Sequence, residues 1–178
     1  MTSYEVYPEP PLIAYKRQKN IKDSIIRAKV STKSERPVRR LKGMKKCTKN
    51  CTACPFVKEG SEVKRFKQKW NITKDVNCET SNCVYMIECQ KEYCKQRYIG
   101  ETDRPISERI SEHRGYIHNK KLNQATGAHF NLPGHGLSDM KFTVLEKVLK
   151  SDESYRKERE SYHIEIFNTF YRGINRKP

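Results

Sequence analysis

Arg109 and His113 stand four residues apart in the C-terminal half of the chain, and these two side-chain types can bind an anion and move a proton. Ile106, Ile110 and Ile117 recur at helical spacing around them, which predicts a helix with one apolar face. Residues i and i+4 lie one above the other on a helix, so both side chains should point toward the interior. A guanidinium held there can donate two parallel hydrogen bonds to a phosphate. The alternatives are an ion pair of Arg109 with a neighbouring glutamate and a half-buried, hydrogen-bonded His113.

Glu160 is a carboxylate in line with apolar residues, because Ile164, Phe167 and Tyr171 follow it at i+4, i+7 and i+11. Burial of an unpaired charge is costly, so this side chain needs a cation. A hard divalent ion with carboxylate and water ligands is one solution, and a salt bridge with an arginine is the other. The periodicity leaves both open. A second apolar face of the same helix is expected from Tyr162, Ile166 and Phe170.

Four cysteines between positions 47 and 78 have a spacing that favours a metal site. Cys47, Cys51 and Cys54 form a C-x3-C-x2-C pattern, and Cys78 follows at a distance. Four thiolates suit a tetrahedral zinc ion, with Cys83 as the alternative fourth ligand. The seven cysteines cannot all pair within one chain, and the first residues lack the pattern of a secretory signal, so a disulfide framework is not expected. The other interpretation is a set of unpaired buried cysteines.

A small sheet is expected to position these residues. The β-rich runs at 83–89 and 96–100 surround a polar stretch, which predicts a hairpin, and 141–148 predicts a third strand. The predicted fold class is therefore α+β, a three-stranded antiparallel sheet flanked by helices, with a basic N-terminal tail and a Cys-rich linker.

Two helices complete this arrangement. Thr102 or Asp103 is expected to cap the first, which has Pro105 in its first turn. The second is expected to start at about 151 and to run to about 168.

The chain divides into three predicted parts. Residues 1–46 hold thirteen Lys or Arg against four acidic residues and are expected to be weakly structured, with one short helix at 20–29. Residues 47–81 form a Cys-rich linker that is a candidate zinc module, and 82–178 form the main domain.

The charge of the chain favours a nucleic acid as partner. The 37 Lys and Arg against 21 Asp and Glu give a formal net charge of +16, and positive surfaces attract phosphate backbones. No run of about 18 apolar residues exists, so no membrane span is expected. The residues expected to contact DNA are Arg39, Arg40, Lys45, Lys46, Arg104 and Arg114.

The order of these residues resembles the GIY-YIG endonuclease superfamily over about 82–175. In place of the first motif's glycine and isoleucine this chain has Cys83 and Val84, and the interval from Tyr98 to Arg109 is one residue longer than in many members. The resemblance implies hydrolysis of DNA phosphodiester bonds with one Mg²⁺ or Mn²⁺ bound by Glu160. The residues that it implies are catalytic are Tyr85, Tyr98, Arg109, His113, Glu160 and Asn175, and Ile99 with Gly100 completes the second motif.

A narrower resemblance is to the endonuclease region of Penelope-like retroelements. It rests on the runs 83–89, 98–102, 128–135, 159–162 and 173–176, and 11–20 together with 51–55 looks like the linker that follows the reverse transcriptase in such elements. The resemblance implies a second zinc site, which would join the predicted hairpin to a later loop. Its implied ligands are Cys89, Cys94, His129 and His135.

The resemblance also implies roles and partners. A tyrosine, either Tyr85 or Tyr98, would activate or orient the attacking water, and Asn175 would orient the backbone near the site. DNA is the expected substrate, a reverse transcriptase domain or element RNA a further partner, and the nucleus the expected location. The sequence leaves open the oligomeric state and whether the chain is a fragment. The alternatives are a structure-specific repair or recombination nuclease, a non-catalytic nucleic-acid-binding relic and a purely structural zinc protein.

Overall fold

The computed structural model describes residues 42–65, 68–149 and 152–176, all within one compact unit that spans Arg40 to Pro178. The helix expected at 20–29, and Arg39 and Arg40, lie outside the described residues. The mixed class predicted from the sequence is confirmed, because the described residues form small sheets together with helices. No helix in the described ranges is long and apolar enough to cross a membrane.

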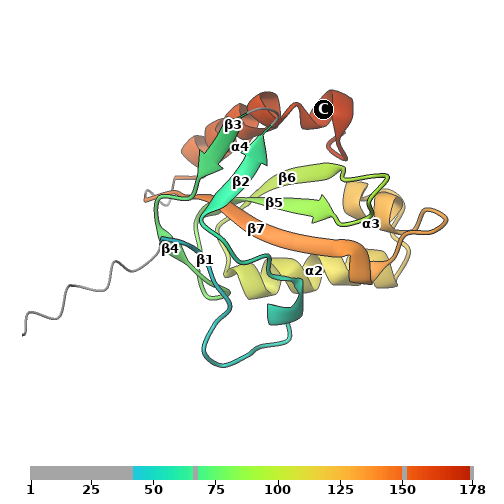
Figure 1. The fold of residues 1–178 in the computed structure, drawn as a ribbon, viewed down its shortest axis with the longest axis horizontal. Helices are drawn as coiled ribbons and strands as arrows, with labels where there is room; N and C mark the ends of the chain where they lie inside the picture. The colour runs from blue at the N-terminus through green and yellow to red at the C-terminus, as the bar shows by residue number, and fades with distance from the viewer. Residues whose placement is uncertain (1–41, 66–67, 150–151, 177–178) are drawn as a thin grey trace, which may run out of the picture. The chain divides into compact units, whose positions relative to one another are not determined.

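The central sheet has three antiparallel strands in the order β6-β5-β7 (Figure 1). Every residue of the middle strand β5 is buried, as expected for a strand with neighbours on both edges and helices on both faces. The third strand begins at Met140, one residue before the predicted start. The strands are β5 (Cys83–Cys89), β6 (Arg97–Thr102) and β7 (Met140–Lys147).

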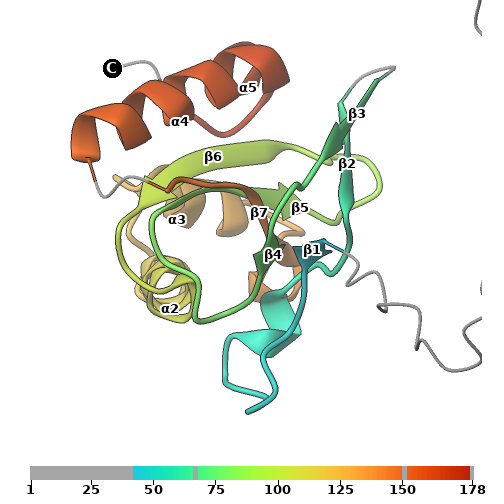
Figure 2. The same cartoon turned by 90° about the vertical axis from the view of Figure 1, so that its left-hand side faces the viewer.

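Helices α2 and α4 lie on opposite sides of this sheet, as Figures 1 and 2 show. The predicted apolar stripe of α2 is confirmed, because Ile106, Ile110 and Ile117 are buried. The predicted cap is wrong: Pro105 occupies the N-cap position, and the Thr102 hydroxyl instead accepts a hydrogen bond from the backbone N–H of Arg104. The helices are α2 (Ile106–His118), α3 (Ala125–Phe130), α4 (Glu153–Phe167), α5 (Thr169–Arg172) and the 3₁₀ turns η1 (Cys54–Phe56) and η2 (Leu137–Asp139).

The last helix begins and ends close to the predicted positions. The Asp152 carboxylate accepts a hydrogen bond from the backbone N–H of Ser154 and caps α4. Asn168 has φ 54°, in the left-handed region, and separates α4 from α5. Because this break interrupts the helical period, Tyr171 does not continue the buried face of Ile164 and Phe167 and is 77% exposed.

The segment before β5 is more regular than the sequence indicated. It forms a parallel pair, β1 with β4, and an antiparallel hairpin, β2 with β3. The indole N–H of Trp70 donates to the backbone oxygen of Leu145, and Val57 bridges Phe142, so this segment packs against β7. The strands are β1 (Gly43–Met44), β2 (Glu62–Arg65), β3 (Gln68–Asn71) and β4 (Asp75–Val76).

The outer edge of β6 is covered by the end of the chain. The backbone N–H of Ile174 donates to the oxygen of Arg97, and the Asn175 side chain bonds both the N–H and the C=O of Ile99, each at 2.8 Å. An edge strand presents unpaired backbone groups, and the amide of Asn175 supplies one donor and one acceptor for them. Asn175 therefore fixes the strand that carries Tyr98.

Candidate active site and metal centres

The side chain of Tyr85 is at the centre of the polar cluster between β5, β6 and α2. Its partner across the sheet is Gly100, where an added Cβ would lie 2.5 Å from the tyrosine hydroxyl oxygen. Only glycine therefore lets this hydroxyl pass over β6 toward α2. The strand register thus explains why a glycine follows Tyr98 and Ile99 at this point of the chain.

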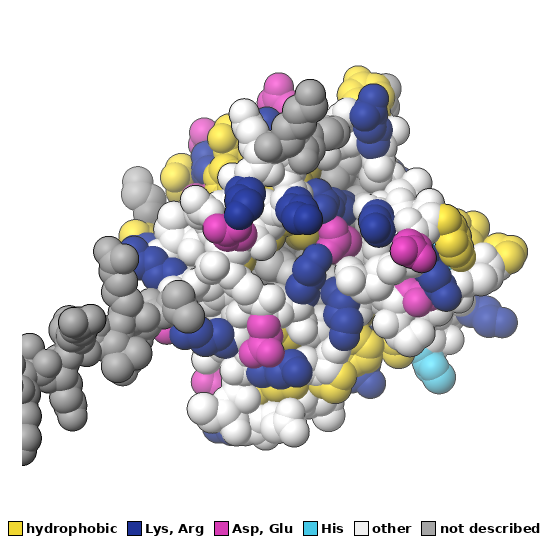
Figure 3. Space-filling model, viewed as in Figure 1, with side chains coloured by type: hydrophobic (Ala, Val, Ile, Leu, Met, Phe, Trp, Pro, Cys, Tyr) yellow, Lys and Arg dark blue, Asp and Glu magenta, His cyan; other side chains and the backbone are white. Residues whose placement is uncertain are grey.

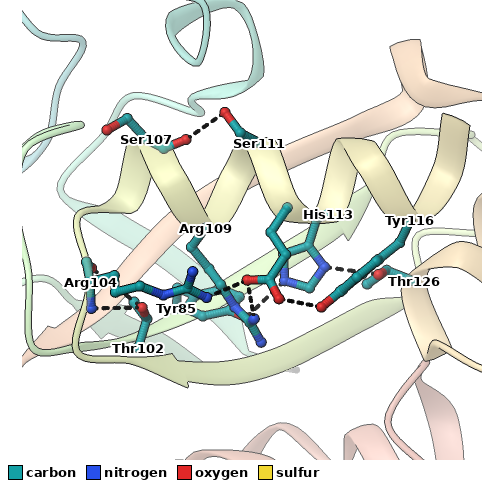
Figure 4. A network of polar contacts seen from close by, with 10 residues as sticks. Tyr85, Thr102, Arg104, Ser107, Arg109, Ser111, His113, Tyr116 and Thr126 are labelled. Atoms are coloured by element: carbon teal, nitrogen blue, oxygen red, sulfur yellow. Dashed lines mark hydrogen bonds and ion pairs between the residues drawn. The ribbon is translucent and has the colours of Figure 1, made fainter. Parts of the chain in front are cut away.

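The hydroxyl of Tyr85 contacts both helical residues that were predicted to point toward the interior. The Nε of Arg109 donates to it at 2.7 Å, and Nε2 of His113 lies 2.8 Å from it (Figure 4). Nδ1 of His113 lies 2.8 Å from the hydroxyl oxygen of Thr126, on α3. A phenol that accepts from Arg109 has its own proton left for His113, so Nδ1 of the neutral ring donates to Thr126.

Burial sets the protonation state of this cluster. It lowers the pKa of His113 to about 3, with a further contribution from the charge of Arg109, and the ring is neutral at physiological pH. Burial also raises the pKa of Tyr85, which is 0% exposed, well above its usual value. Burial disfavours the charged form of Arg109 as well, but Tyr85 and Glu112 outweigh it and raise the pKa of the guanidinium.

Glu112 is a member of the cluster that the sequence reasoning did not name. Its carboxylate binds Arg109 at 2.6 Å, Arg104 at 2.5 Å and the hydroxyl of Tyr116. Burial alone would raise the pKa of Glu112, but the hydrogen bonds from Tyr116, Arg109 and Arg104 lower it to about 2. The ion pair considered for Arg109 is therefore present together with its bond to Tyr85. The i,i+3 spacing of Arg109 and Glu112 was the signal for it.

Glu160 approaches the same cluster from α4, across the edge strand β6. It is half-buried, and burial followed by the charge of Glu101 raises its pKa. The charge of Arg109 opposes this rise, while burial and the charge of Glu160 raise the pKa of the half-buried Tyr98. Among the described residues no lysine, arginine or histidine forms an ion pair with Glu160, whereas Arg156 binds Glu101 at 2.8 Å.

The other arginine close to Glu160 on α4 is also paired elsewhere. Arg159 binds Glu146 at 2.7 Å, and the buried His163 lies 2.9 Å from the same carboxylate. The salt bridge that was the alternative explanation of Glu160 is thus not formed within the described residues. The sequence reasoning did not single out Glu146 or His163, which are far from each other along the chain.

The first cysteine cluster joins the segment from β1 to the start of η1, which contains Cys47, Cys51 and Cys54, to Cys78 in the turn after β4. The Sγ atom of Cys54 lies 3.5 Å from that of Cys47, 3.8 Å from Cys51 and 3.7 Å from Cys78. Thiolates bound at about 2.3 Å to a tetrahedral zinc ion lie about 3.8 Å apart, so the spacing fits such an ion. Cys78, and not Cys83, is the fourth member. Cys83 is buried in β5, and burial raises the pKa of its thiol to about 12.

The second cluster joins the end of β5 and the β5–β6 turn, which contain Cys89 and Cys94, to α3 and the loop after it, which contain His129 and His135. The ligand atoms of Cys89, Cys94, His129 and His135 all lie within 4.8 Å of one another, and Sγ of Cys94 is 3.6 Å from Nε2 of His129. Nε2 of His135 is buried without a hydrogen-bond partner, while its Nδ1 is 3.2 Å from the oxygen of Pro133. A metal-bound histidine has this arrangement, with one nitrogen on the metal and the other held by a carbonyl. Both clusters can therefore bind a metal such as zinc.

Four of the residues expected to contact DNA lie in the described ranges, and each of them has a partner within the protein. Arg104 binds Glu112, the carboxylate that also binds Arg109. The guanidinium of Arg114 lies 5.0 Å from the ring centre of Phe56. Lys45 pairs with Asp75 and Lys46 with Glu59.

A different group of cations gathers on the face shown in Figure 3, where dark blue side chains surround a few acidic ones. A groove on the protein surface is lined by Lys58, Lys64, Lys95 and Arg97. Two acidic residues line it as well: Glu62, and Glu88, which binds Lys58 and Arg97. The sequence reasoning did not find this groove, because β2 and the β5–β6 turn are distant along the chain.

Comparisons of the chain with protein-family models, with curated proteins and with solved structures found no match.

Proposed function

We propose that this protein is a metal-dependent DNA endonuclease. The observation that carries the proposal is the meeting of a cationic, a hydroxyl and a carboxylate side chain at one sheet edge. Arg109 comes from α2, Tyr98 from β6 and Glu160 from α4. An arginine for the phosphate, a hydroxyl for the water and an unpaired carboxylate for a cation are the groups that phosphodiester hydrolysis requires.

Each residue has a separate task in this proposal. Arg109 neutralises the charge that develops on the non-bridging oxygens, and its bonds to Tyr85 and Glu112 hold it in place. Glu160 would hold one Mg²⁺ or Mn²⁺, a Lewis acid for the phosphate. Its raised pKa and its lack of an ion-pair partner in the described chain fit a carboxylate that a cation would stabilise.

Tyr98 is the better of the two tyrosine candidates for contact with the attacking water. Tyr85 is fully buried, and its hydroxyl is already hydrogen-bonded to Arg109 and to His113. Tyr98 is half-buried, so part of its surface faces solvent. Tyr85 and His113 therefore position Arg109, and Tyr98 orients the water.

The two cysteine-containing clusters complete the proposal as structural zinc sites. The first would hold the loops before β5 together, and the second would join the β5–β6 turn to the loop that contains His135. The β5–β6 turn contains Lys95, which lines the groove with Lys58, Lys64 and Arg97. The second zinc site would therefore also fix part of a surface that is suited to phosphates.

We further propose that the sheet and its helices form a GIY-YIG fold, and that the chain is the target-nicking endonuclease of a Penelope-like retroelement or a derivative of one. The support is the position of Tyr85 on the central strand and of Tyr98 on its neighbour, with Arg109 on the helix that follows. A reverse transcriptase domain or element RNA would then be a partner, and the nucleus the site of action.

The test is cleavage of supercoiled plasmid by zinc-loaded protein with Mg²⁺, with Mn²⁺ or without added divalent cation. Chelators are omitted, since they would also remove zinc from the cysteine clusters. We expect nicked or linear product only with added cation, and retained DNA binding without cleavage for Arg109→Ala and Glu160→Ala. Cleavage by Glu160→Ala at the parent rate would refute the assignment. Salt-dependent binding without any cleavage by the parent would instead favour a non-catalytic nucleic-acid-binding protein.

A further inference from the structure

An apolar cavity of about 520 Å³ lies between the β2–β3 hairpin, the end of β7 and the start of α4. None of the residues of the proposed active site lines it. Its volume is in the range of pockets that enclose a small ligand. Its apolar lining consists of Trp70, Leu145, Val148, Leu149 and Tyr155.

Two aromatic side chains, Trp70 and Tyr155, line this cavity, and contacts with neighbouring residues hold the ring of Trp70. The indole N–H of Trp70 is occupied by the oxygen of Leu145 at 3.0 Å, and its ring meets His163 edge-on at 4.7 Å. These contacts fix the plane of the ring while the residue stays half-buried. Tyr155, on α4, is 36% exposed. Fixed, partly exposed aromatic rings provide stacking surfaces for nucleobases.

The rim of the cavity is positively charged. Arg159 and Glu146 neutralise each other, but Lys74 and Lys147 form no ion pair within the described ranges. Lysines beside an apolar, aromatic pocket match a nucleotide, whose base is a flat ring and whose phosphate is an anion. The net charge of +16 makes a polyanionic strand the ligand of matching chemistry.

We infer that this cavity binds an unpaired nucleobase, with the adjoining phosphates on Lys74 and Lys147. The inference rests in part on the proposed function, because α4 also carries Glu160. Tyr155 and Glu160 are five residues apart on that helix, an axial separation of about 7.5 Å. At 100° per residue the two side chains project about 140° apart around the helix axis, so a strand that crosses this helix would place its base in the cavity and its cleaved phosphate at Glu160. The substrate class is DNA with unpaired nucleotides beside the cleavage site.

Trp70 is the only tryptophan of the chain, so its fluorescence reports on this cavity alone. The experiment titrates zinc-loaded Glu160→Gln protein, without added Mg²⁺ or Mn²⁺, with single-stranded oligothymidylate and with an abasic oligonucleotide of equal length. Fluorescence anisotropy of a label on the DNA measures total binding in parallel. We expect the base-containing strand to quench Trp70 in a saturable way and the abasic strand to bind without quenching.

Tyr155→Ala and Lys147→Glu test the lining while they retain the reporter. Loss of one stacking partner should weaken binding of the base-containing strand by about 5- to 150-fold. The matched controls are Tyr171→Ala, an exposed tyrosine outside the cavity, and Lys120→Glu, the same charge change at an exposed position. Circular dichroism confirms that each variant is folded.

Two results would overturn the inference. One is an unchanged Trp70 emission while anisotropy shows bound DNA, and the other is equal quenching by the abasic strand. A protein that cleaves plasmid but shows either result would retain the proposed function and lose this site. A protein that never cleaves but shows base-dependent quenching would retain the site and lose the proposed function.

Discussion

The buried side chain of His113 determines the direction of the hydrogen bonds that its neighbours form. It is 2% exposed, and it is hydrogen-bonded through both ring nitrogens. Because the ring is neutral, its Nε2 can accept a hydrogen bond from the Tyr85 hydroxyl. The oxygen of that hydroxyl is then free to accept a hydrogen bond from Arg109. A charged ring would donate from both nitrogens and reverse this order.

The stability of the protein should therefore depend on pH through His113. Its pKa in the folded protein, about 3, lies below the value near 6.5 of an unfolded histidine. The stability that the neutral His113 contributes is thus fully present above about pH 6.5, and it is lost progressively as the pH falls toward 3. Between about pH 7.5 and 5.5 the loss is about 1.4 kcal/mol.

The measurement is urea unfolding of the parent and of His113→Gln at several pH values in this window. The substitution lowers stability at every pH, but it should also remove this part of the pH dependence. Groups other than His113 titrate alike in both proteins and cancel in the comparison. Identical slopes would show that His113 is not buried in a neutral form.

A second residue-level prediction distinguishes the two tyrosines. Tyr98→Phe should lower the single-turnover cleavage rate by about 10²- to 10⁴-fold, the range for a lost proton-handling group, with DNA affinity unchanged. Tyr85→Phe should also lower the free energy of unfolding, because it leaves the buried Arg109 and His113 without their shared partner. A Tyr98→Phe enzyme as fast as the parent would remove Tyr98 from the mechanism.

Spacing along the chain predicted part of this site and missed the rest for a physical reason. Arg109 and His113 are four apart on one helix, so their approach follows from helical geometry alone. Thr126 reaches His113 only because α3 packs against α2, and Glu160 reaches β6 only because α4 crosses the sheet. Contacts of that kind depend on tertiary packing, which no local pattern contains.

At the scale of elements, the position of Tyr98 depends on the outer edge of β6, which the end of the chain covers. Tyr98 is on this strand, and its position depends on how the edge is closed. The Asn175 side chain closes it with two hydrogen bonds to Ile99.

Asn175→Ala should accordingly destabilise the protein by about 1–3 kcal/mol, because two backbone groups lose their partners. It should also slow cleavage, since β6 would position Tyr98 less well. Urea unfolding and single-turnover kinetics measure the two effects. Asn119→Ala, at an exposed position, is the control and should stay within about 0.5 kcal/mol of the parent. An unchanged stability of Asn175→Ala would contradict the role of this side chain.

The elements before β5 show what periodicity fails to detect. The strands β2 and β3 have four residues each and are mostly exposed, so neither has a clear apolar alternation. Their order comes from long-range contacts of Trp70 and Val57 with β7. The longer, buried strands β5 and β7 were predictable because burial leaves a continuous apolar pattern in the sequence.

The metal clusters give an element-level prediction. The purified parent should contain two zinc ions per chain, one for each cluster. Cys94→Ser should contain one and should lose more than about 2 kcal/mol of stability, since the β5–β6 turn is no longer joined to the His135 loop. Zinc content by atomic emission and thermal unfolding test this, with Cys83→Ala as the control that keeps both ions. Two ions in Cys94→Ser would contradict the assignment.

At the scale of the molecule, residues on both sides of position 82 belong to one compact unit. The backbone N–H groups of Ile106 and Ser107, at the start of α2, donate to the oxygens of Thr80 and Cys78. The helix that contains Arg109 thus begins against the loop that contains a ligand of the first metal cluster. We therefore expect loss of that metal to displace the start of α2 and, with it, Arg109.

The distribution of charge belongs to the same scale. Lys58, Lys64, Lys95 and Arg97 line a groove on one face, and Glu160 with Arg109 lies at the β6 edge. Binding and cleavage are therefore expected to depend on different residues, so that a substitution at the β6 edge can stop the reaction without loss of affinity.

The most direct test of the central claim is the single-turnover rate of a labelled DNA in Mg²⁺ for the parent, Glu160→Gln and Glu165→Gln. Glu165 is on the same helix and exposed, so it controls for the loss of one negative charge. We predict that Glu160→Gln loses about 10²-fold or more of the rate with unchanged DNA affinity, while Glu165→Gln cleaves like the parent. Equal rates for Glu160→Gln and the parent would contradict a catalytic site at the β6 edge.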